Sequence, residues 1–204
     1  MKILVVSPTP SHPPTAGNRR RIQALATALR ERGAHLSFLY YAREDIDSRT
    51  YNDLKSFWDE FYLVQTGQMY TPPPADHFRV DDWVTRPLSE TFLSTVREKE
   101  FDAVIINYVM LSSLSELVDD RTLTILDTHD VFAGRDEMLR GMGRKPDFFW
   151  TSLEEEAKGL VRQDVVLAIQ NREAEYFKTA ANEVLLVGHM EPQRPYKGGV
   201  RDDI

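Results

Sequence analysis

The sequence predicts an α/β fold with a doubly wound, mostly parallel sheet of about seven strands, and two observations support this prediction. Short apolar runs of strand length recur at residues 1–7, 36–41, 60–64, 102–107, 123–127, 164–169 and 183–187. Segments with helical periodicity lie between them, at residues 18–32, 48–58, 88–100, 112–118, 152–162 and 172–180. Strands that alternate with helices are typical of a parallel sheet with helices on both faces.

The chain opens with a strand, a polar loop and an amphipathic helix. The apolar residues of 1–7 are continuous, as expected of a strand that is buried on both faces. The loop at residues 8–16 contains four prolines, which exclude a helix there. Gly17 then marks the start of a helix whose apolar residues fall on one stripe, and Gly33 is a natural stop signal.

The start of this helix is a place where an anion can bind. A helix N-terminus offers unpaired N–H groups and the positive end of the helix dipole, and Gly17 lets another molecule approach the backbone closely. Arg19, Arg20 and Arg21 oppose the dipole in the first turn, at a cost of about 0.3 kcal/mol or more each, which a negative ligand would relieve. The alternative, a solvated basic turn, stays open.

Composition limits the classes of function. The chain has 204 residues, of which 42% are hydrophobic, which suits one domain of ordinary to large size or a domain with a tail. A net charge of −7 argues against nucleic-acid binding, and the absence of cysteine excludes disulfides, thiol catalysis and Cys-based zinc sites. No apolar stretch has the length of a membrane span, and the N-terminus lacks the pattern of a signal peptide. We therefore expect a cytoplasmic protein, with peripheral membrane contact left open.

Three segments interrupt the alternation of strands and helices. Residues 66–87 carry a run of three prolines and predict a loop excursion. Residues 134–150 begin with a glycine and contain two more glycines and a proline among long apolar side chains. We interpret this segment as a flap. Periodicity is lost after Val187, so residues 1–187 are predicted to form the domain, and residues 188–204 a linker or a disordered tail.

Polar residues follow several of the predicted strands. In open parallel sheets, ligands bind beyond the carboxyl ends of the strands. Such ends occur at Ser7, at Asn107 and Tyr108, at residues 127–130 and at residues 170–173. The densest polar cluster contains Asp127, Thr128, His129 and Asp130. A histidine flanked by carboxylates can be held in one tautomer for hydrogen bonding or proton transfer. The alternative is that Asp130 or Thr128 caps the next turn and His129 is structural.

Other patterns are absent or are interpreted structurally. The chain lacks the G-x-G-x-x-G, P-loop and G-x-S-x-G motifs, which disfavours dinucleotide oxidoreductases, P-loop NTPases and α/β-hydrolases. Its other histidines show no ligand spacing, so no metal is expected. The glutamates at residues 154–156 predict a solvated helix face. Phe148, Phe149 and Trp150 are interpreted as packing over an edge of the core, with stacking on a sugar left open.

The chain resembles the N-terminal domain of the family 4 retaining glycosyltransferases, which have the GT-B fold. The resemblance rests on KILVVSPTPSHPPTAGNRRR at residues 2–21, on residues 25–36, on LDTHDVFAGR at residues 126–135 and on residues 162–177. It covers the chain to about residue 187. It implies the Rossmann-like, acceptor-side half of an enzyme that transfers a sugar from a nucleotide-sugar donor, with retention and without a metal or other cofactor. The implied acceptor is a carbohydrate, a lipid-linked molecule or a small molecule.

The resemblance also implies roles for residues. His129 corresponds to the histidine beside the transferred sugar and is the catalytic candidate. Gly17 corresponds to the glycine that contacts the donor phosphates. The remaining predicted donor-phosphate or acceptor-binding residues are Asn18, Arg19, Arg20, Asp127 and Asp130. The family's donor-binding C-terminal domain has no counterpart in these residues, so the 204 residues alone are expected to be inactive. The alternative function is a non-catalytic Rossmann-like binding or partner module.

Overall fold

The structure, a computed structural model, describes residues 1–66, 73, 76–146 and 148–190. Within these residues seven strands form one sheet, in the order β3-β2-β1-β4-β5-β6-β7. Every neighbouring pair of strands is parallel. The predicted doubly wound α/β sheet is therefore confirmed, and its described part is wholly parallel. The strand order reverses between β1 and β4, which creates a crevice at the carboxyl ends of these two strands.

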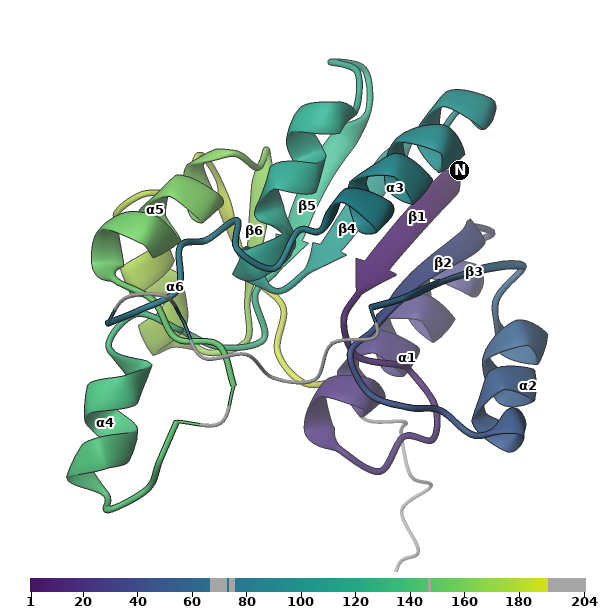
Figure 1. The fold of residues 1–204 in the computed structure, drawn as a ribbon. Helices are drawn as coiled ribbons and strands as arrows, with labels where there is room; N and C mark the ends of the chain where they lie inside the picture. Colours follow the sequence, from purple (N-terminus) through teal and green to yellow (C-terminus); the bar gives the residue numbers. More distant parts are fainter. Residues whose placement is uncertain (67–72, 74–75, 147, 191–204) are drawn as a thin grey trace, which may run out of the picture.

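Apart from one helix within residues 134–150, the elements lie close to the predicted segments (Figure 1). The strands are β1 Lys2–Ser7, β2 His35–Ala42, β3 Glu60–Gln65, β4 Ala103–Asn107, β5 Leu123–Asp127, β6 Val165–Ala168 and β7 Val184–Leu186. The helices are α1 Gly17–Arg30, α2 Ser48–Phe57, α3 Arg86–Glu98, the 3₁₀ helix η1 Val109–Leu117, α4 Arg135–Gly141, α5 Leu153–Val161 and α6 Asn171–Phe177.

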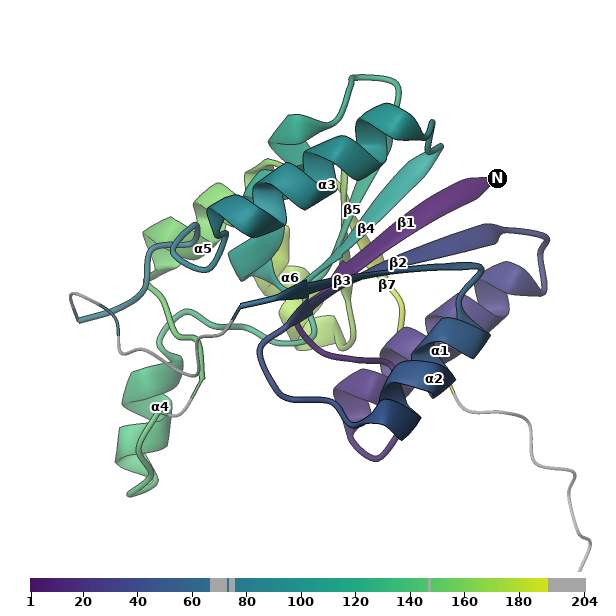
Figure 2. The same cartoon turned by 45° about the vertical axis from the view of Figure 1, so that its right-hand side comes forward.

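The sheet has a core on each face because side chains alternate along a strand. Ile3 and Val5 of β1 belong to the core that α1 and α2 cover. Leu4 and Val6 belong to the opposite core, to which α3, η1, α5 and α6 contribute. Figure 2 shows α1 and α2 on one side of the sheet and α3 and α5 on the other. Loops, and not either core, lie at the carboxyl edge of the sheet.

The segment after β4 differs from the prediction. Residues 109–117 form a 3₁₀ helix, whereas the periodicity predicts an α-helix over residues 112–118. The carbonyl oxygen of Ser112 accepts hydrogen bonds from Gln163 Nε2 at 3.0 Å and from Ser115 Oγ at 2.8 Å. These side-chain bonds compete with the backbone pattern that an α-helix requires.

The interpretation of residues 134–150 as a flap missed a helix. Helix α4 follows Gly134, whose φ of 67° is left-handed, and it projects away from the sheet (Figures 1 and 2). A β-bridge between Ala133 and Thr151 closes its base. Phe149 and Trp150 are buried in the core, as predicted. The glycines in and after this short helix hide it in the sequence.

The start of α3 and the acidic turn of α5 also depart from the predictions. The described residues 76–85 form a loop, as expected, and its Phe78 and Trp83 are buried in the core. Helix α3 begins at Arg86 rather than at residue 88, because the first turn of a helix tolerates Pro87. The prediction of a solvated face at residues 154–156 is wrong for Glu156, which is only 1% exposed.

The structure describes only part of the predicted linker or tail. Residues 188–190 continue from β7, whereas residues 191–204 of the predicted linker or tail lie outside the described residues. The boundary at residue 187 stays a prediction. Among the described helices, none is both long and apolar enough to cross a bilayer.

Candidate functional site

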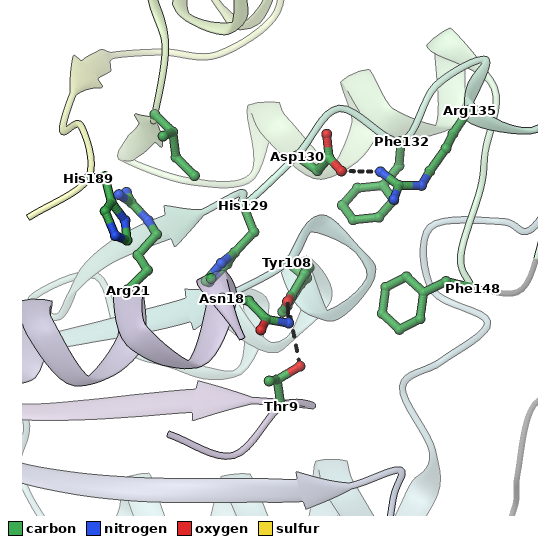
Figure 3. A pocket seen from close by; sticks show the side chains of 12 residues that line it. Thr9, Asn18, Arg21, Tyr108, His129, Asp130, Phe132, Arg135, Phe148 and His189 are labelled. Atoms are coloured by element: carbon green, nitrogen blue, oxygen red, sulfur yellow. Dashed lines mark hydrogen bonds and ion pairs between the residues drawn. The ribbon is translucent and has the colours of Figure 1, made fainter. Parts of the chain in front are cut away.

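A pocket of about 470 Å³ opens at the carboxyl edge of the sheet, where β1, β4 and β5 end (Figure 3). Thr9, which follows β1, Tyr108, which follows β4, and His129, which follows β5, all line it. The N-terminus of α1 contributes Gly17 and Asn18. The pocket therefore lies at the switch point of the sheet, where ligands bind in open α/β folds.

Two pocket residues have an unusual backbone conformation. Tyr108 has a φ of 72° and His129 a φ of 62°, and they are the non-glycine residues with positive φ in the described part of the chain. Such a conformation costs about 1–3 kcal/mol per residue and is concentrated at functional sites. Their rings stack with centroids 4.4 Å apart and an interplanar angle of 14°. The strained turns thus place two stacked rings at the ends of adjacent strands.

The tautomer of His129 follows from its neighbours. Asn107 donates from Nδ2 to the carbonyl oxygen of Val6 at 3.1 Å, which leaves its Oδ1 as an acceptor. This oxygen lies 2.6 Å from His129 Nε2, so Nε2 carries the proton and Nδ1 is the ring's acceptor. Burial lowers the pKa of His129 and outweighs the opposite effect of Asp127. The imidazole is therefore neutral at neutral pH.

Asp127 supports the site from within the core. Its side chain is fully buried, and both of its oxygens accept hydrogen bonds from Arg21 Nε, at 2.8 and 2.9 Å. Arg21 Nη2 also lies 2.7 Å from Asp127 Oδ1, as an ion-pair contact without an aligned hydrogen bond. His129 Nε2 is 3.5 Å from the other oxygen of Asp127. The charge of Asp127 is thus neutralised mainly by Arg21.

The start of α1 is open toward the pocket. A methyl group built on Gly17 would meet no atom of the described residues within 4 Å, and the φ of Gly17 is not left-handed. Asn18 Nδ2 donates to the hydroxyl of Tyr108 at 2.9 Å, and the Thr9 hydroxyl lies 3.5 Å from the same oxygen. The polar contacts of the Tyr108 hydroxyl therefore join α1 to the end of β4. Among the described residues, none packs so closely that position 17 must be a glycine.

The outer rim combines an ion pair with aromatic rings. Asp130 pairs with Arg135, and the Arg135 guanidinium lies over the ring of Phe132, 5.4 Å from its centroid (Figure 3). Phe148 completes this wall, and its ring centroid lies 6.0 Å from that of Tyr108. Glu156 fixes the turn behind it by accepting from the backbone N–H of Phe132 at 2.8 Å and of Ala133 at 3.1 Å.

The structure brings together only some of the predicted site residues. Gly17, Asn18, His129 and Asp130 line the pocket, whereas Arg19, Arg20 and Asp127 do not. Arg19 Nη2 pairs with Glu44 at 2.8 Å. Arg20 donates from Nε to the carbonyl oxygen of Pro14 at 2.9 Å.

Part of the pocket was not predicted. The lining residues without a predicted role in the site are Thr9, Phe132, Arg135, Ile169 and His189. Arg21, Tyr108 and Phe148 also line the pocket, and the sequence indicated them only loosely: Arg21 as part of a basic helix turn, Tyr108 as a strand end, and Phe148 as an aromatic residue whose stacking on a sugar was left open. A signal for Arg21 existed, because it precedes Leu25 by one helical turn and so shares the face of α1 that packs inward. In the described residues no three His, Asp, Glu or Cys side chains are placed to hold a metal ion.

Comparisons with known proteins show the fold of the chain and nothing beyond it. No protein-family model matches the chain, and no curated protein is significantly similar to it. A sucrose-phosphate synthase from Thermosynechococcus elongatus matches with a TM-score of 0.62 and 14% identity, over 92% of this chain and 47% of that one. A UGT transferase from Siraitia grosvenorii in complex with UDP matches with a TM-score of 0.53 and 10% identity, over 92% and 51% of the two chains.

A third structure, LpCGTa in complex with UDP, has a TM-score of 0.51 and 10% identity, over 94% of this chain and 53% of that one. The chain thus spans about half the length of these glycosyltransferase structures. The described sheet is shared with one of their domains. The chain has the Rossmann-like half of a GT-B fold.

Proposed function

We propose that this chain is the acceptor-side half of a retaining glycosyltransferase that takes a nucleotide-sugar donor. The observation that carries the proposal concerns Gly17. This glycine lies at the start of α1 and lines the switch-point pocket, yet no described residue occupies the space that a side chain would need there. Amide groups at the start of a helix bind phosphate oxygens. A ligand phosphate that approaches this backbone supplies the reason for glycine that the fold lacks.

His129 is the proposed catalytic residue. Its neutral ring presents Nδ1 as an acceptor because Asn107 holds Nε2–H. A hydroxyl of the transferred sugar can donate a hydrogen bond to Nδ1. A neutral acceptor does not repel the positive charge that develops on the sugar in the transition state. Desolvation, which lowers the pKa of His129, keeps the ring in this form.

The outer rim is the proposed acceptor side. Phe148 offers an apolar surface, and Asp130 and Arg135 offer charged hydrogen-bonding groups, a combination that suits a ring with one apolar face and peripheral hydroxyls. In the transfer, the bond between the anomeric carbon and the donor phosphate oxygen breaks, and a bond to an acceptor oxygen forms on the same face. The nucleoside diphosphate leaves with the bonding electrons, and its leaving phosphate oxygen takes the proton that the acceptor hydroxyl gives up.

A second domain supplies the rest of the donor site in this proposal, and neither a metal nor another cofactor takes part. The protein acts in the cytoplasm, and its acceptor is a carbohydrate, a lipid-linked molecule or a small molecule. A lipid-linked acceptor would bring the protein into peripheral contact with a membrane. The residues described here contribute Gly17 and His129 to that shared site.

The test uses the protein expressed from its whole coding sequence. It is incubated with a panel of nucleotide-sugars and acceptors, and release of the nucleoside diphosphate and the anomeric configuration of the product are measured. We expect transfer with retention, and a loss of at least about a hundredfold in kcat in His129→Ala. His35→Ala is the control, because His35 is half exposed at the opposite edge of the sheet. Inversion, unchanged turnover in His129→Ala, or a binding module without turnover would each overturn the proposal.

A further inference from the structure

The chain that leaves the last strand returns to the pocket. The backbone N–H of Val187, directly after β7, donates to the carbonyl oxygen of Ala168 at 2.8 Å. The carbonyl oxygens of Val187 and Gly188 then accept from Arg21 Nη1, at 2.8 and 3.3 Å. His189 follows, and it lines the pocket, as Arg21 does (Figure 3). A segment 60 residues away in sequence from His129 thereby forms part of the same site.

One guanidinium makes both sets of contacts. Arg21 is 2% exposed, and its Nε and Nη2 face Asp127 while its Nη1 faces the two carbonyl oxygens. The planar fork of arginine presents five donors in fixed directions, whereas a lysine ammonium is a single point charge. Only arginine can therefore pair with the carboxylate and hold the two carbonyl groups together.

We propose that Arg21 is a positioning residue that holds Val187 and Gly188, thereby places His189 in the wall of the pocket, and registers this segment against the end of β5. Asp127 transmits the registration, because its own backbone carbonyl accepts from the N–H of Tyr108 at 2.9 Å and it precedes His129 by two residues. Movement of the segment away from α1 leaves a buried N–H of Arg21 without its acceptors, which is unfavourable. The segment after β7 and the two stacked rings are thus coupled through one ion pair.

The positioning role of Arg21 goes beyond the proposed function and does not depend on it. Arg21 would hold the segment after β7 whatever ligand the pocket binds, since its contacts close one side of the pocket. If the glycosyltransferase proposal fails, the contacts of Arg21 with Val187 and Gly188 still predict the same behaviour of the segment.

The test compares Arg21→Lys with wild type by amide hydrogen exchange and by NMR of the histidine rings. A lysine keeps a cation beside Asp127 but cannot also hold the carbonyl groups. We expect exchange of the Val187 amide to accelerate about tenfold and the His189 ring signals to shift, while amides of β5 keep their protection. The pKa of His129 should stay below its ordinary value, because burial, its largest cause, and a cation near Asp127 are both retained.

Two further variants keep the test decisive. Arg32→Lys is the matched control, since Arg32 lies just after α1 and its Nη1 donates to the carbonyl oxygen of Ala28, at 3.1 Å, within its own helix end. Arg21→Gln combined with Asp127→Asn removes both buried charges and serves if Arg21→Lys does not fold. In that variant the Val187 amide should also exchange faster. A folded variant of either kind with unchanged exchange at Val187 and unmoved His189 signals would show that Arg21 supports β5 alone, and would overturn the proposal.

Discussion

Replacing Gly17 by alanine separates the stability of the fold from its capacity to bind a ligand. In the part of the chain that the structure describes, the added methyl group would meet no atom within 4 Å, and the backbone φ lies outside the left-handed region that alanine avoids. Alanine also favours a helix over glycine and restricts the unfolded chain. We therefore expect the free energy of unfolding of Gly17→Ala to equal that of wild type or to exceed it by at most about 1 kcal/mol.

The cost in binding follows from the same geometry. The methyl group stands where a phosphate oxygen would approach the first amides of α1, and it pushes that oxygen out of hydrogen-bonding distance. A hydrogen bond to a charged group contributes about 1.5–3 kcal/mol. Its loss corresponds to a decrease of roughly ten- to hundredfold in affinity for a nucleoside diphosphate.

The assay pairs urea unfolding with calorimetric titration of UDP into the protein expressed from its whole coding sequence. Gly141→Ala is the matched control: its added methyl group also meets no atom of a described residue within 4 Å, and Gly141 does not line the pocket. Unchanged UDP affinity in a folded Gly17→Ala would refute the role given to this glycine. A loss of stability greater than about 1 kcal/mol would refute the geometric argument instead.

Three further predictions concern stability and its pH dependence. Gly159→Ala should lower the free energy of unfolding in urea by about 1–3 kcal/mol, because the new methyl carbon would lie 2.9 Å from Ser112 Oγ and closer still to Val109; a wild-type value would mean that η1 yields freely. Burial raises the pKa of Glu156 above 4.5, so its contribution to stability falls as the pH rises from 4.5 through the folded pKa, and Glu156→Gln should remove this slope from the stability profile. Burial lowers the pKa of His129 below 6.5, so its contribution is complete above pH 6.5 and is lost as the pH falls through the folded pKa; an NMR titration that places this pKa above 6.5 would contradict the assigned environment.

Most of the fold could be predicted because local patterns and the tertiary contacts agree. Residues 103–106 are all apolar, and residues 123–126 are apolar except for Thr124; a strand between two helical layers requires such a largely apolar run. The predictions failed where tertiary contacts override the local preference. Gln163 takes the Ser112 carbonyl and favours a 3₁₀ helix, and the carboxylate of Glu156 is drawn inward by the backbone N–H groups of residues 132 and 133.

The site was predicted in outline for a related reason. Parallel strands place all their carboxyl ends at one edge, so the cluster around His129 and the loop before Gly17 were expected to lie close together. Which arginine of the first turn faces inward was not predicted. Arg19 and Arg20 are turned to Glu44 and to a loop carbonyl, whereas Arg21 is buried against Asp127.

The sequence by itself determined the strand and helix alternation, the parallel sheet and the edge at which polar residues gather, because these depend on periodicity and on the order of elements along the chain. Only the tertiary structure decided which partner each polar group meets. The stacking of Tyr108 on His129, the tautomer set by Asn107 and the hold of Arg21 on the carbonyl groups after β7 join residues that are far apart in sequence. No local pattern encodes such contacts, since they arise when the assembled sheet brings separate strand ends within a few ångströms of one another.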